Sequence, residues 1–85
     1  METKMPARAH LATFPAAQAR FNLAELMARG LITRNQLDVT LRAIDSTEAG
    51  DVTIDQRTPK SVLYVRTPSR AFQVNNRAKL QLLTE

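Results

Sequence analysis

Hydrophobic residues in the first half of the chain follow the period of an α-helix. Apolar residues recur at steps of three and four from Phe14 to Ala28, and again from Leu37 to Ile44. Positions three and four apart lie on one helix face. The pattern therefore predicts two helices, over about residues 14–29 and 34–45.

The stretch GLITRNQL between these two helices specifies a tight corner. Gly30 suits the residue that follows a helix, where a positive φ is common. Thr33 is a good N-cap, and Gln36 three residues later completes a capping box. Ile32 and Leu37 flank the cap at the spacing of a hydrophobic staple. We therefore expect a turn of about three residues.

The longer phrase GLITRNQLDVTLRAI resembles a pattern in the helical N-terminal domain of type II secretion and pilus-assembly ATPases. The resemblance covers about fifteen residues and consists of the capping box, the staple and the apolar stripe. The second half of this chain departs from that all-helical domain, so the resemblance implies a shared helix corner and no function.

Beyond residue 50 the period changes from 3.6 to 2. DVTID and RAFQV alternate apolar with polar residues, as half-exposed strands do. SVLYV is apolar at four consecutive positions, which is typical of a central strand covered on both faces. The pattern predicts strands over about residues 51–55, 61–66 and 70–74.

The last ten residues leave two interpretations open. A two-residue turn at Asn75 and Asn76 would place Phe72 opposite Lys79, a poor match for one buried face. Asn76 can instead cap a short helix. We favour a fourth strand over about 78–83, reached by a longer or bulged turn.

These elements predict an α+β fold, with two N-terminal helices packed on a small, mostly antiparallel sheet of three or four strands. The chain has 85 residues, which fits one small domain. Residues 1–12 lack periodicity and are expected to form a flexible arm, and residues 13–85 to form the globular domain.

Candidate chemistry is sparse. The chain has no cysteine and one histidine, His10, and its two glycines belong to no phosphate-binding loop. We therefore expect no enzyme activity, metal, cofactor or small-molecule substrate. No stretch of about 18 apolar residues occurs, which argues against a membrane span. The N-terminal stretch lacks an apolar leader core, and we expect a cytoplasmic protein.

Charge is unevenly distributed along the chain. The net charge is +4, yet residues 45–56 hold four acids and no Lys or Arg, whereas residues 57–85 hold six basic residues and one acid. A polyanion is attracted to such a basic segment. The candidate nucleic-acid-binding residues there are Arg57, Lys60, Arg66, Arg70, Arg77 and Lys79.

The exposed side of the second helix is another candidate surface for DNA. Arg34 and Asn35 stand near its N-terminus, where a helix-turn-helix reads base edges, and Arg42 follows two turns later. Asp38 lies one turn from both arginines and repels phosphate. If the capping box forms, the Gln36 side chain is used in it and is not available to a base. The basic turns are therefore the stronger indication of DNA contact.

A protein partner is also expected. The first helix is apolar over more than one face, and we expect partner contacts at Arg20, Leu23 and Met27, or at the acidic residues Asp51 and Asp55. A homodimer through this helix is compatible with the pattern.

The sequence thus predicts a non-enzymatic accessory regulator, similar in role to a co-repressor, that holds DNA phosphates beside a larger transcription factor. The alternative is a protein-only adaptor or inhibitor that binds an acidic surface of an enzyme or polymerase. Composition does not separate the two.

Overall fold

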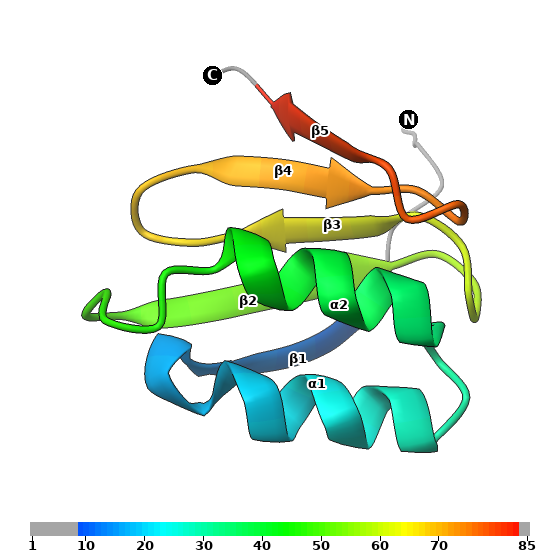
Figure 1. Ribbon diagram of the computed structural model, residues 1–85, viewed down its shortest axis with the longest axis horizontal. Coiled ribbons are helices and arrows are strands. Elements are labelled where there is room, and N and C mark those ends of the chain that lie inside the picture. The colour runs from blue at the N-terminus through cyan, green and yellow to red at the C-terminus, as the bar shows by residue number, and fades with distance from the viewer. Residues whose placement is uncertain (1–8, 84–85) are drawn as a thin grey trace, which may run out of the picture.

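The computed structural model describes residues 9–83 (Figure 1). Within them, two α-helices and one five-stranded sheet form two layers. The elements in chain order are β1 (Ala9–Pro15), the short 3-10 helix η1 (Ala16–Gln18), α1 (Ala19–Ala28), α2 (Arg34–Ala43), β2 (Asp51–Gln56), β3 (Leu63–Arg66), β4 (Ala71–Val74) and β5 (Leu80–Leu83). Neither helix of this part of the chain is long and apolar enough to cross a membrane.

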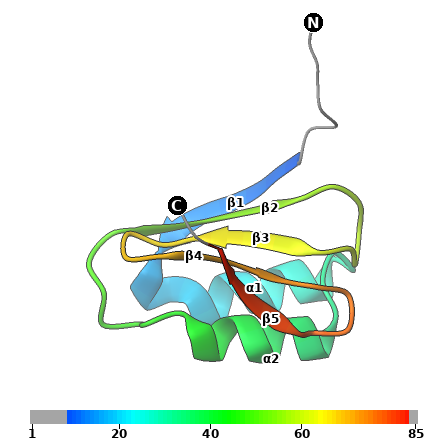
Figure 2. The ribbon, with the colours of Figure 1, turned by 90° about the horizontal axis from the view of Figure 1, so that it is seen from above.

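The strands lie in the order β1-β2-β3-β4-β5, and every neighbouring pair is antiparallel. Both helices are inserted between β1 and β2 and lie on one face of the sheet, while the other face is uncovered (Figure 2). Alternate strand residues such as Ile54, Val65 and Phe72 point to the helices and are buried. The core therefore lies between the two layers.

The predicted sheet of three or four strands is wrong, because a fifth strand precedes the helices. Residues 9–12, assigned to the arm, pair with β2, and residues 1–8 lie outside the described part. The helix expected from residue 14 begins at Ala19. A register irregularity between His10 and Ala12 breaks the alternation that would reveal β1. Pro15, which falls within the predicted helix range 14–29, is the last residue of this strand.

The expectation that SVLYV is covered on both faces is also wrong. Leu63 and Val65 are buried against the helices, but Tyr64 is half-buried on the uncovered face, and Val62 precedes the strand. A run of consecutive apolar residues does not reveal how many faces of a strand are covered.

The corner between the helices is confirmed. Gly30 has φ of +79°, and Leu31 N–H donates to the carbonyl of Leu26 at 3.0 Å, the helix ending that such a glycine permits. Thr33 and Gln36 form both hydrogen bonds of the capping box, each at 3.0 Å. This part of the fold follows from local capping chemistry.

The last strand is present, after a turn longer than two residues. Val74 pairs with Leu80, and Asn75 N–H donates to the carbonyl of Lys79 at 3.0 Å across the turn. Ala78 has φ of +63°. This turn places the basic residues 77 and 79 beyond the paired strands.

Candidate nucleic-acid interface

Three turns meet at one end of the sheet. Because neighbouring strands are antiparallel, β2 and β4 end at the same end of the sheet at which β3 and β5 begin. The β2–β3 loop (57–62) and the β4–β5 turn (75–79) therefore lie beside the α1–α2 corner (29–33), as Figure 1 shows. The N–H of Lys60 donates to the carbonyl of Leu31 at 2.8 Å and joins the loop to the corner.

The side chain of Gln36 connects all three turns. It is fully buried, and its Oε1 accepts from the N–H of Thr33 in the corner at 3.0 Å. Its Nε2 donates to the carbonyl of Ser61 at 2.9 Å and to that of Asn75 at 3.2 Å. Buried polar groups that are fully hydrogen-bonded fix a unique geometry. One amide thus holds the two sheet turns against the helix corner.

Backbone N–H groups of the two sheet turns are used within the turns. Ser61 Oγ accepts from the N–H of Thr58 at 3.1 Å, and the Ser61 N–H donates back to the carbonyl of Thr58 at 3.1 Å. Asn75 Oδ1 accepts from the N–H groups of Arg77 and Lys79 at 2.9 and 3.0 Å. At Thr58, Ser61, Arg77 and Lys79 an anion must therefore be met by side chains, because these four N–H groups already have partners.

Six exposed cations converge on these turns. We call the surface that they form the basic end; its residues are Arg29, Arg34, Arg57, Lys60, Arg77 and Lys79. Within residues 9–83, the ion pair found among them joins Arg34 Nε to Asp38 Oδ1 at 4.0 Å. Such an exposed pair contributes little. Like charges gathered at one end of a molecule raise the local potential for an anion.

The opposite end of the molecule is mixed in charge. The acids Asp45, Glu48 and Asp51 lie there, in and after the α2–β2 connection, together with four arginines: Arg20, Arg42, Arg66 and Arg70. Hydrogen bonds from the side chain and the N–H of Thr47 lower the pKa of the Asp45 carboxyl, and nearby Arg70 lowers it further. Three acids against four arginines leave a net charge of +1 from these residues, so this end has only a small excess of positive charge.

Arg70 has a structural role at that end. Its Nη2 donates to the carbonyl of Ala43 in the last turn of α2 at 2.6 Å, and its guanidinium lies 6.0 Å from the centre of the Phe72 ring. A cation at a helix C-terminus satisfies carbonyls that lack helical partners. Arg70 links the β3–β4 turn to α2.

The structure divides the residues predicted to bind DNA into two groups. Arg57, Lys60, Arg77, Lys79 and Arg34 meet at the basic end, with Asn35 beside them on the first turn of α2. Arg42, Arg66 and Arg70 lie toward the other end. Five of the eight predicted cations therefore lie at one end of the molecule, and the other three lie at the opposite end.

The residues predicted to meet a partner do not form one surface. Leu23 is fully buried in the core, so its side chain is not available at the surface. Met27 is partly buried against the same core, and Arg20 is exposed on α1. Asp51 is exposed at the start of β2, while Asp55 lies on the uncovered sheet face.

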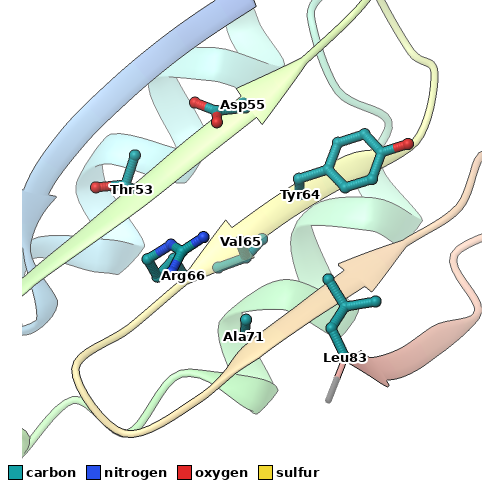
Figure 3. Close-up of a pocket in the computed structure, with 7 residues that line it drawn as sticks. All are labelled: Thr53, Asp55, Tyr64, Val65, Arg66, Ala71 and Leu83. Atoms are coloured by element: carbon teal, nitrogen blue, oxygen red, sulfur yellow. The ribbon is translucent and has the colours of Figure 1, made fainter. Parts of the chain in front are cut away.

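A shallow depression on the uncovered face adjoins these residues. Figure 3 shows Asp55 and Thr53 from β2, Tyr64 and Arg66 from β3, and Leu83 from β5 around it. The depression carries one carboxylate and one guanidinium, so its charge is balanced. It offers no concentration of cations comparable with the basic end.

Comparison with protein-family models, curated proteins and solved structures finds no match to this chain. The site must therefore be interpreted from its own geometry.

Arg29 is the residue of the basic end that the sequence did not select. It is the C-cap of α1, where its N–H donates to the carbonyl of Glu25 at 3.0 Å, and its side chain is exposed. A cation at the C-cap of a helix is ordinary capping chemistry. Only the proximity of the two sheet turns makes Arg29 part of a larger patch.

Proposed function

We propose that this protein is a non-enzymatic DNA-associated regulator whose basic end holds the DNA phosphate backbone beside a larger DNA-binding protein. The observation that carries the proposal is the convergence of six exposed cations on three turns joined through one buried glutamine. Cations that are already clustered neutralise phosphates and release condensed counterions. A cytoplasmic location, expected from the sequence, stays part of this proposal.

The expected contacts are with phosphates and not with base edges. Gln36 is buried and hydrogen-bonded to the turns, so Arg34 and Asn35 are the exposed side chains on the first turn of α2, too few to read a base sequence. Phosphate contacts fix position and add affinity but carry no sequence information. Sequence choice is therefore assigned to the partner protein, and this chain strengthens its hold on DNA.

The mixed charge of the opposite end supports the same orientation. Asp45, Glu48 and Asp51 repel phosphate there, while the basic end attracts it. Such an asymmetric molecule approaches a polyanion with the three turns first. The acidic connection then faces away from DNA, where a protein partner can reach it.

The test is a fluorescence-anisotropy titration of a labelled 20-base-pair duplex at several salt concentrations. The variant Arg57→Glu/Lys60→Glu/Arg77→Glu removes three cations of the basic end. The matched control Arg20→Glu/Arg42→Glu/Arg66→Glu changes the net charge by the same amount at the other end. All six positions are exposed, so both variants should fold.

We expect the basic-end variant to lose at least about tenfold in affinity, with the salt slope reduced by about 0.9 for each lost phosphate contact. The control should lose less than about threefold, because screening leaves only weak long-range effects. Equal losses in both variants would mean that net charge alone drives binding. A protein that binds no duplex at low salt, yet forms a complex with an acidic protein surface, would favour the adaptor alternative.

A further inference from the structure

Strand β5 leaves apolar side chains uncovered at the edge of the sheet. Leu80 is 41% exposed and Leu82 is 56% exposed, although both pair in register with buried residues of β4. Their partners Val74 and Phe72 are fully buried under the helices. The helix layer does not extend far enough to bury β5, which lies beyond both helices in Figure 1.

The two edges of the sheet differ in how they are protected. β1, at one edge, has an irregular register between His10 and Ala12 and ends in Pro15, features that oppose pairing with another strand. β5, at the other edge, pairs regularly with β4 and contains the sequence LQLL, without charge or proline. An edge of this kind is open to a further strand.

We infer that β5 pairs antiparallel with β5 of a second copy, centred on Gln81, to form a two-fold dimer with a continuous ten-stranded sheet. In this register Leu80 lies opposite Leu82 of the second copy, and Leu82 lies opposite Leu80 of the second copy. Directly opposed residues share a sheet face, so the four leucines gather on the helix side. A slip by one residue would put the two helix layers on opposite faces.

The exposed leucines lie beyond the helix layer, as Figure 1 shows for the strand that carries them. In this register the four leucines of the two copies pack against one another. The contact would bury side chains that are 41% and 56% exposed in a single copy.

Charge also favours the antiparallel arrangement. Arg77 and Lys79 precede β5 at one end of the strand, so two-fold pairing places the basic turns of the two copies at opposite ends of the dimer. A parallel arrangement would bring them together. β5 itself has no charge to oppose contact.

The small size of the contact sets its strength. A four-residue strand and two partly exposed leucines offer much less than the roughly 800 Å² per partner of a stable dimer. The dimer should therefore be weak and in rapid exchange, with dissociation in the high micromolar range. If the proposed DNA contact holds, two basic ends in one dimer would bind a duplex more tightly than one.

Sedimentation velocity from 10 µM to 1 mM of the full chain tests the dimer. The Leu82→Lys variant should stay monomeric at every concentration, because a lysine on the edge strand blocks pairing. The control Phe21→Lys replaces a side chain that is 72% exposed on α1 and should dimerise as the parent does. A parent protein that is monomeric at 1 mM, or a dimer lost in Phe21→Lys and kept in Leu82→Lys, overturns the inference.

A cysteine cross-link tests the register. The chain has no cysteine, so Gln81→Cys supplies a single thiol opposite its own copy, at a Cα separation of about 4.5–5.5 Å that a disulfide can bridge. Mild oxidation should give a covalent dimer, which the added Leu82→Lys change should suppress. Gln73→Cys, on the same face but one strand inward, should not cross-link; equal cross-linking of both variants contradicts the register. Neither experiment contains DNA, so their outcome is independent of the proposed function.

Discussion

Replacement of Gln36 by methionine tests whether one buried amide holds the basic end together. Methionine has nearly the same length and shape, but it has no amide to donate or accept. The change removes three side-chain hydrogen bonds, one to each turn. The turns would then be joined mainly by the Lys60 N–H to Leu31 carbonyl bond.

The size of the effect follows from what is left unpaired. The carbonyl of Ser61 keeps a donor in Gln56 Nε2 at 3.0 Å, and that of Asn75 keeps the N–H of Ala78 at 2.8 Å. The N–H of Thr33 loses its capping partner. Three neutral hydrogen bonds at about 0.5–1.5 kcal/mol each give a loss of roughly 1.5–4.5 kcal/mol in the free energy of unfolding. The free energy of unfolding of a domain is about 0.05–0.15 kcal/mol per residue. The variant should therefore remain folded, with a lower stability.

Urea denaturation followed by circular dichroism measures the loss, and amide hydrogen exchange shows where it falls. Exchange should accelerate first at the turns that contain Ser61 and Asn75. The control Gln56→Met removes one hydrogen bond from a residue that is also buried, and should cost about 1 kcal/mol. The reasoning is refuted if the free energy of unfolding of Gln36→Met lies within about 0.5 kcal/mol of that of the parent protein and amide exchange at the turns is unchanged.

Three further predictions concern residues outside the basic end. Gly50→Ala should cost at least about 2 kcal/mol by thermal denaturation, because φ is +121° and the new Cβ would lie 2.6 Å from Pro68 Cγ; an unchanged melting temperature contradicts this. Thr40→Val should raise stability by about 1 kcal/mol, since Thr40 Oγ1 is buried without a hydrogen-bond partner in the described residues; a loss would indicate a missed partner. Thr47→Ala should raise the pKa of Asp45 toward its ordinary 3.8 in a carboxyl NMR titration. Because folding lowers the pKa of Asp45, the stability that this carboxylate adds is present above about pH 4 and disappears as the pH falls through the folded value. An unchanged Asp45 pKa in Thr47→Ala would exclude the Thr47 side-chain hydrogen bond as the main cause of the lowered pKa.

The helix corner could be predicted because its causes are local. Gly30, Thr33 and Gln36 lie within seven residues, and capping chemistry depends on little else. β1 could not, because its register shift removes the alternation by which strands are recognised. Thr13 and Pro15 also imitate a helix start, although the observed η1 has no side-chain cap.

The candidate site was predictable in its chemistry but not in its assembly. The charge of Arg57, Lys60, Arg77 and Lys79 is visible in the sequence, yet their meeting depends on a strand order in which alternate turns share one end. Gln36 could be assigned to the capping box. Its bonds to carbonyls 25 and 39 residues away are set by tertiary structure.

The central claim is that DNA meets the three joined turns. The most direct measurement is a two-dimensional NMR titration of the labelled protein with a short duplex, repeated at higher salt. We predict that amide shifts concentrate in residues 29–34, 57–61 and 75–79 and that they fade as salt rises. Shifts that instead cluster around Arg66 and Arg70, or that spread evenly over the surface, would contradict the account.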